Sequence, residues 1–225
     1  TMRSAPLGQD VLFDEKDVEL GRNFCNKLWN ACRFRQMQGG ASEGEIDPNL
    51  LTSDDKWILV RLDKAIREID SAYEGYRFNE ITASLYRFFW SEYCDWYVEA
   101  SKTVFFGEDA KLKANKLAVI DFVLGNLLRL FHPFLPFISE ELWHGMGYSK
   151  DMPENRGGRS IMVATWPKPL TDDEKSYFGL EDSADEVAQA KYDLVVLGRN
   201  LRAQFNLAAG KKVRFDLKPS GHIDP

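Results

Sequence analysis

The sequence predicts a mostly α-helical protein, an antiparallel helical bundle followed by a small α+β unit. Apolar residues recur every three or four positions over four stretches of roughly 20 residues, which is helical periodicity. The joins between these stretches are short, and long helices with short joins pack most readily as antiparallel neighbours. Of the 225 residues, 44% are hydrophobic, which is enough for a substantial core. Three cysteines, an odd number, argue against a disulfide framework and indicate the reduced thiols of a cytoplasmic protein.

We expect the bundle to occupy residues 17–168. Residues 1–16 lack periodicity and are interpreted as a connector from a preceding domain. The first helix is predicted over 17–37, ending at the glycines that follow Gln38. Hydroxyl, amide and acidic side chains mark the later helix starts, because they satisfy free backbone N–H groups. The expected helices run from Thr52 to Gly75, from Asn79 to Gly107, from Asp109 to Pro133, and over 140–145 after a Ser139 cap.

Residues 169–225 are predicted to form a linker and part of a small α+β domain. A short strand is expected just before it, at 160–164. An acidic stretch then leads into a helix over 183–204, whose Val187, Leu194, Leu197 and Leu201 are expected to face inward. Apolar and charged residues alternate from Lys211 to Leu217, which is typical of a half-buried strand. This unit is incomplete if the strand has partners beyond residue 225.

The first helix carries two different faces. At 100° per residue, Phe24, Cys25, Leu28, Trp29 and Cys32 share an apolar side. The opposite side holds amides, cations and one aromatic residue, with no acid. Solvated helix faces usually mix Glu with Lys, so this composition favours a surface that binds a polar anion; the alternative is a helix whose Asn side chains bond neighbouring loops. The residues of the polar side are Arg22, Asn23, Asn26, Lys27, Asn30, Arg33 and Phe34.

Charge is distributed unevenly along the chain. The net charge is −6, which alone would disfavour nucleic-acid binding. Residues 20–42, however, hold four cations and no acid, and residues 194–215 hold five cations and no acid. Two basic islands on an acidic body can still direct a polyanion. No apolar run approaches the roughly 20 residues that a membrane span requires, so no membrane association is expected.

Catalytic motifs are weak or absent. Glu141 and His144 form one Glu-x-x-His, the spacing used by di-metal bundles, but such a site needs a second copy and further carboxylates. No Cys-x-x-Cys, phosphate-binding loop or nucleophile elbow occurs. We therefore predict neither a catalytic residue nor a metal site in this chain.

Several blocks together resemble a known family. Residues 22–31 read Arg-Asn-Phe-Cys-Asn-Lys-Leu-Trp-Asn-Ala, and residues 88–97 read Phe-Phe-Trp-Ser-Glu-Tyr-Cys-Asp-Trp-Tyr. Both resemble the anticodon-binding helical bundle of class I aminoacyl-tRNA synthetases, in the version found in bacterial valine–tRNA ligases. Residues 132–143, from His-Pro-Phe-Leu-Pro-Phe to Leu-Trp, resemble a block that the valine, leucine and isoleucine enzymes share. Residues 199–203 together with 211–213 resemble the family's following small domain.

The resemblance implies a C-terminal fragment of an ATP-dependent ligase that charges tRNA with valine in the cytoplasm. The family's two ATP signatures and its editing domain do not occur in these residues, so ATP and Mg would bind in a catalytic domain outside this chain. The implied partner is the valine tRNA, and the implied parent protein is monomeric. Alternatives are the same region of an isoleucine or leucine enzyme, or a helical module that docks a protein partner.

The expected tRNA contacts lie mainly on the first helix. Cations would meet phosphates or base edges, Asn side chains would read base edges, and an aromatic ring would stack on an unpaired base. The first set is Arg22, Asn23, Asn26, Lys27, Trp29, Asn30, Arg33, Phe34 and Arg35. A weaker set is Trp57, Arg61, Arg199, Arg202, Lys211 and Lys212.

Overall fold

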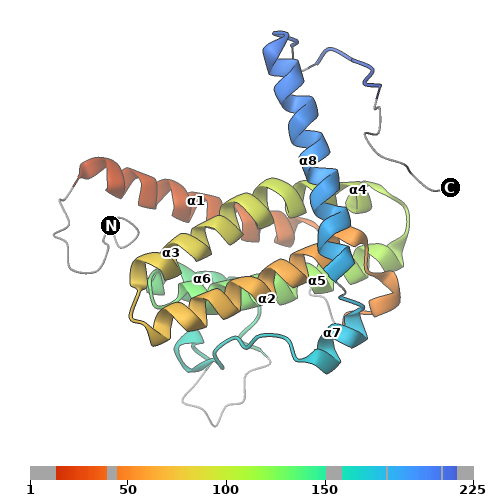
Figure 1. Ribbon diagram of the computed structural model, residues 1–225. Helices are drawn as coiled ribbons and strands as arrows, with labels where there is room; N and C mark the ends of the chain where they lie inside the picture. Colours follow the sequence, from red (N-terminus) through yellow and green to blue (C-terminus); the bar gives the residue numbers. More distant parts are fainter. Residues whose placement is uncertain (1–13, 40–44, 151–158, 181, 209, 217–225) are drawn as a thin grey trace.

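The computed structural model describes residues 14–39, 45–150, 159–180, 182–208 and 210–216, with the side chains of 182–185 left out. Long helices lie side by side in a bundle, and the last helix projects from it (Figure 1). No strand occurs in these described ranges, so the mostly α-helical prediction is confirmed. The helices of the bundle are α1 (Glu15–Met37), α2 (Ser53–Glu74), α3 (Phe78–Tyr86), α4 (Val98–Phe106), α5 (Ala110–Phe131) and α6 (Pro136–Gly145). They are followed by α7 (Asp172–Phe178) and α8 (Asp182–Gln204).

Helix starts follow the predicted capping chemistry in two of four places. The Thr52 hydroxyl accepts from the Asp55 N–H and the Asp55 carboxylate accepts from the Thr52 N–H, a complete capping box. Asp109 caps α5 through its carboxylate. The Asn79 cap is wrong, because α3 begins one residue earlier and its N-cap residue makes no side-chain cap bond. Ser139 lies inside α6, where its hydroxyl donates to the Leu135 carbonyl 2.8 Å away.

The predicted third helix is one continuous rod with an unusual middle. An eleven-residue π-helical segment, η3 (Arg87–Tyr97), joins α3 to α4. π-Helical turns are mostly short and are often found at functional sites. Phe89, Tyr93 and Tyr97 of η3 are fully buried in the core. The wider turn thus carries large rings inward while Trp90 and Asp95 remain accessible to solvent.

The core connects α1 to the rest of the bundle. Leu28 and Cys32 are fully buried, as their apolar face predicts, and Cys25 is half-buried. The Phe24 ring meets the rings of Phe89 and Phe131, each with its centroid 5.3 Å away. Burial raises the pKa of the Cys32 thiol to about 12. A thiol with that pKa stays protonated and unreactive, which agrees with a structural role.

The two predicted strands are not observed. Ile161–Val163 forms a short 3-10 helix (η5) capped by Ser160. Residues 211–216 have no regular structure, and the seventh residue of that prediction lies outside the described ranges. Alternation alone does not make a strand without a neighbouring strand to pair with. The division of the chain at residues 16/17 and 168/169 stays a prediction.

Helix α8 is found where it was predicted, but it packs with a different face. Ala188 and Tyr192 are its buried residues, and the Tyr192 ring meets Trp57 of α2 at 4.7 Å. Val187, Leu194 and Leu197, which the periodicity predicts to point inward, are 64%, 43% and 53% exposed. Periodicity identifies the helix, but it does not show which of its two apolar stripes meets the bundle.

Tyr76 occupies a backbone conformation that favours glycine. It follows α2 with φ of +55°, and its neighbour Arg77 donates its N–H to the Ala72 carbonyl 2.8 Å away. This is a Schellman ending, in which the left-handed residue is usually Gly. Tyr76 is 70% exposed, so its ring adds little buried area.

Replacing Tyr76 with Gly is therefore expected to stabilise the protein. Removing the strain of a left-handed side chain is worth about 1 kcal/mol, or about 2–4 °C in midpoint for a chain of this size. Thermal unfolding would measure the shift. Asn206→Gly, at the other left-handed non-glycine position that the structure describes, is the control and should gain less because Asn tolerates this conformation. An equal or larger gain at Asn206 would contradict the explanation.

Candidate nucleic-acid interface

The solvent-facing stripe of α1 gathers the residues that the sequence singles out. Arg22, Asn26, Trp29, Asn30 and Arg33 are all exposed, and their spacing of three or four residues places them along one side of the helix. Trp29 is 46% exposed, although its position near the apolar face allowed it to be a core residue. A stripe of this kind offers amide, cation and ring side by side, the groups that bind unpaired bases and their phosphates.

The described residues do not engage the amides of this side of α1. Within the ranges that the structure describes, Asn23, Asn26 and Asn30 make no side-chain hydrogen bond to the protein. The alternative explanation, in which these Asn side chains bond neighbouring loops, finds no support there. Three exposed amides with free donors and acceptors can read the edges of unpaired bases.

Two cations of the stripe are also available. Arg33 is exposed and has no acidic partner among the described residues. Arg22 meets Glu19 at 3.4 Å, but both side chains are more than 60% exposed. A solvent-screened ion pair of this kind contributes little to the free energy of folding. A phosphate can therefore replace Glu19 at low cost.

Lys27 lies between α1 and η3. Its Nζ is 3.2 Å from Asp95 Oδ1 and 5.0 Å from the centre of the Trp90 ring. The ammonium is thus held by a carboxylate and an indole of the neighbouring helix. Phe34, about two turns further on, is half-buried and meets the Phe105 ring of α4 edge-on at 6.0 Å. Through these contacts, η3 and α4 lie next to the polar side of α1 and form the other part of the candidate interface.

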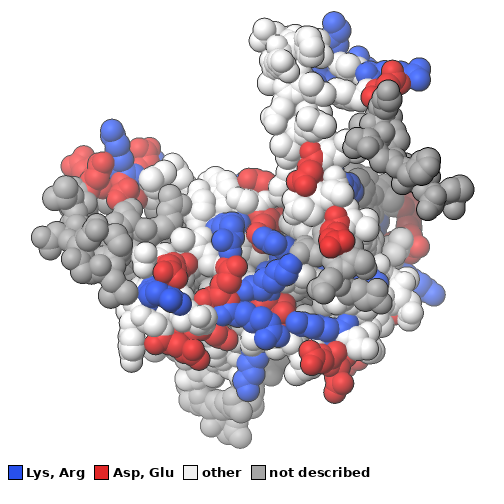
Figure 2. Space-filling model, viewed as in Figure 1, with Lys and Arg blue, Asp and Glu red and all other residues white. Residues whose placement is uncertain are grey.

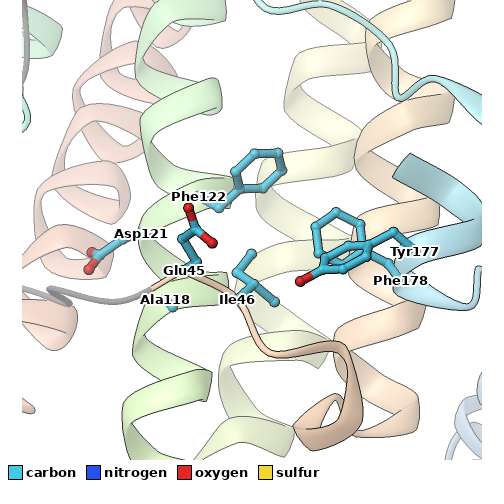
Figure 3. Close-up of a pocket in the computed structure, with 7 residues that line it drawn as sticks. All are labelled: Glu45, Ile46, Ala118, Asp121, Phe122, Tyr177 and Phe178. Carbon is cyan, nitrogen blue, oxygen red and sulfur yellow. The ribbon is translucent and has the colours of Figure 1, made fainter. Parts of the chain in front are cut away.

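Arg35 does not belong to this surface, which corrects the sequence prediction. The side chain is 4% exposed, and its guanidinium donates two hydrogen bonds to Asp121 at 2.6 and 2.7 Å. It also donates to the Gly39 carbonyl at 2.8 Å. Asp121 accepts a further bond from the Tyr148 hydroxyl. In Figure 3 the Asp121 carboxylate points toward α1, away from the Phe122 ring. Arg35 holds α1 against α5, so we drop it from the proposed interface.

The structure also removes the weaker predicted contacts on α2. Trp57 is 2% exposed beneath Tyr192 of α8. Arg61 is paired with Glu92 of η3. Trp57 is thus buried under α8, and Arg61, which is 26% exposed, is engaged by a carboxylate of η3.

One cation of the second basic island, Arg199, lies beside η3. The Arg199 guanidinium stands 5.2 Å from the centre of the Trp96 ring, next in sequence to the Asp95 that holds Lys27. η3 therefore contacts one cation from each island. Arg202 donates to the Lys211 carbonyl at 2.9 Å and ties the end of α8 to the following loop. Lys211 and Lys212 are exposed.

The described residues also contain a hollow and the Glu-x-x-His motif. A hollow of about 370 Å³ lies between α5, α7 and residues 45–46 (Figure 3), and its lining is mostly apolar. His144 bonds Glu140 at 2.8 Å, not the Glu141 of the Glu-x-x-His motif. No group of three or more possible metal-binding side chains occurs among the described residues. Over α2 and α3, Lys and Arg alternate with Asp and Glu in Figure 2, so that face has no single-signed patch.

Comparison with protein families decides the classification. Residues 55–217 match the model of the anticodon-binding domain of tRNA ligases. The chain belongs to this family. The matched residues cover most of α2 and all of α3 to α8.

The family match begins after α1, but individual relatives also align with α1. The chain is 35% identical to a valine–tRNA ligase of Listeria innocua and 37% identical to one of Geobacillus stearothermophilus, each over 94% of the chain and 23% of the relative. It is 39% identical to one of Geobacter sulfurreducens, over 93% of the chain and 22% of the relative. Alignments of this extent include most of α1. The chain spans about a quarter of the length of these relatives.

The anticodon-binding domain also presents groups that the sequence does not single out. Tyr86 and Trp90 stack with centroids 5.4 Å apart and an interplanar angle of 10°. Their spacing of four residues is a signal for a shared helical face, but it does not tell a stack that reaches solvent from ordinary core packing. The π-helical turns of η3 could not be anticipated from periodicity. None of the helices in the described part of the chain combines the length and the apolar character that spanning a membrane requires.

Proposed function

We propose that this chain is the anticodon-binding region of a valine–tRNA ligase, and that α1 binds the anticodon loop of the valine tRNA. The observation that carries the proposal is the exposed, acid-free stripe of amides and cations on α1, in a chain that belongs to the anticodon-binding domain family. Valine is favoured because each relative named above is a valine–tRNA ligase and aligns over almost the whole chain.

The proposed division of labour follows the chemistry of the stripe. Arg22 and Arg33 contact phosphates, while Asn23, Asn26 and Asn30 read base edges. Trp29 or Phe34 stacks on an unpaired base, since every base offers a ring face. Arg199, Lys211 and Lys212 supply weaker, sequence-independent attraction from the second island.

The parent protein would supply the rest of the reaction. We propose that it is a monomeric cytoplasmic enzyme that uses ATP and Mg in a separate catalytic domain to join valine to the tRNA. The role of the present residues is to hold the tRNA by its anticodon. Charging assays on the parent protein with valine, isoleucine and leucine would separate the three related specificities.

The proposal is tested by titrating the chain with valine tRNA and with the same tRNA carrying an altered anticodon. Each base that stacks on the protein contributes about 1–3 kcal/mol to binding, so the altered tRNA should bind about tenfold or more weakly. Both titrations must be made at the same salt concentration. Equal binding of the two tRNAs would favour a protein-docking role for α1 and contradict the proposal.

A further inference from the structure

Three aromatic rings pack against one another where α1 meets α3 and η3. Phe24 lies 5.6 Å from Tyr86 and 6.3 Å from Trp90, with interplanar angles of 29° and 27°. Tyr86 and Trp90 are themselves stacked at 5.4 Å. Phe24 is anchored in the core by Phe131. Trp90 is partly exposed, as Phe24 and Tyr86 are, and its packing against these two rings holds the indole in place.

The Lys27 ammonium also lies over this indole in the free protein. Lys27 Nζ stands 5.0 Å from the ring centre while Asp95 Oδ1 holds it at 3.2 Å. Asp95 of η3 is the acid that pairs with Lys27, and its side chain is 49% exposed. The negative charge of Asp95 on η3 repels a polyanion, whereas α1 has no acid from residue 20 onward.

We propose that Trp90 is a stacking site for an unpaired base of the bound RNA, closed in the free protein by Lys27 under the control of Asp95. The inference rests on the proposed function and deepens it. A phosphate of the RNA binds the Lys27 ammonium and draws it away from Asp95 and from the Trp90 ring. The neighbouring unpaired base then stacks on the indole in place of Lys27. The ligand class is thus a single-stranded loop, in which bases are free to leave their own stack.

The contacts of Lys27 suit a gate that opens on binding. Its ion pair is solvent-exposed and its cation–π contact is partly exposed, and both kinds of interaction are weak at such sites. A single-stranded loop replaces both contacts that Lys27 loses, because it supplies a phosphate for the ammonium and a base for the indole. A duplex supplies phosphates alone, so it displaces Lys27 without filling the site. The arrangement therefore rejects paired RNA as well as accepting loops.

The first test compares an RNA hairpin carrying the anticodon loop with a blunt duplex of the same stem. Trp90→Leu is expected to weaken hairpin binding about tenfold and to leave duplex binding unchanged. Trp90→Phe, which keeps a ring, should retain most of the affinity. Trp166→Leu is the matched control, since Trp166 is half-buried beside Tyr73 on a different segment. An unchanged preference for hairpin over duplex in folded Trp90→Leu would overturn the inference.

A second measurement reports stacking directly. With 2-aminopurine at successive loop positions of the hairpin, saturating protein should strongly quench the fluorescence at one position, and Trp90→Leu should abolish that quenching.

Asp95→Asn should strengthen duplex binding severalfold and reduce the preference for the hairpin over the duplex, because Lys27 is released from its carboxylate partner. Weaker duplex binding by Asp95→Asn would contradict the gate. If the unaltered chain binds neither RNA, the proposed function fails; if it binds the hairpin but Trp90 has no effect, the stacking site alone fails.

Discussion

Replacing Arg35 with Ala should destabilise the protein by about 3–5 kcal/mol, the usual cost of removing one partner of a buried ion pair. The guanidinium is 4% exposed and bonds both oxygens of Asp121. Without it, the largely buried Asp121 carboxylate loses two charge-assisted hydrogen bonds. Urea unfolding monitored by tryptophan fluorescence would give the change in the free energy of unfolding.

The physical reason can be separated from simple loss of packing. The double variant Arg35→Met with Asp121→Leu removes both charges and fills their space, so it should recover part of the stability that the single variant loses, less the cost of leaving the Tyr148 hydroxyl without its acceptor. Lys102→Ala, which removes an exposed pair with Glu99, should cost less than about 1 kcal/mol. If the double variant were as unstable as the single one, packing rather than the uncompensated charge would be responsible.

The second large effect concerns RNA binding by α1. Replacing Arg22 and Arg33 together with Gln should weaken the binding of valine tRNA at least tenfold at low salt. It should also flatten the dependence of log K on log salt concentration by about 1.4, since each phosphate contact of a single strand contributes about 0.7. Both side chains are exposed, so the thermal midpoint should change little. Filter binding or fluorescence anisotropy over a range of salt concentrations would measure both quantities.

A matched pair of cations serves as the control for this experiment. Lys64 of α2 and Lys168 of the segment before α7 are also exposed, and neither belongs to α1 or η3. Replacing both with Gln removes the same net charge. If this control variant showed as large a decrease in affinity as the α1 variant, the interaction would depend on overall charge and not on the polar stripe.

Helix positions were the most predictable part of the fold, because apolar periodicity and capping chemistry are local. Thr52, Asp109 and the stop at Pro133 each act within one or two turns. The packing partner of a helix is not local. Nothing in residues 183–204 showed that Tyr192, rather than Leu194 or Leu197, meets the bundle. The strand expected at 211–217 is not formed over its described residues, 211–216, because a strand also depends on a partner that the local sequence does not reveal.

The candidate site shows the same limit. Periodicity placed Arg22, Asn26 and Arg33 on one face of α1, where the structure also has them. It could not foresee that Arg35 would find Asp121, 86 positions away, or that Trp57 would be covered by α8. It also missed Trp90, because the relation of η3 to Lys27 depends on a π-helical segment with no clear sequence signature.

The central claim is that the polar stripe of α1 holds the anticodon loop. Its most direct test is photo-crosslinking of the chain to valine tRNA with 4-thiouridine at the central anticodon position, followed by mass spectrometry of the linked peptides. We predict that the main cross-linked peptides fall within residues 22–34, with Trp90 as the nearest site on the facing wall. Cross-links confined to α5, α6 or α7, with none on α1, would contradict the claim.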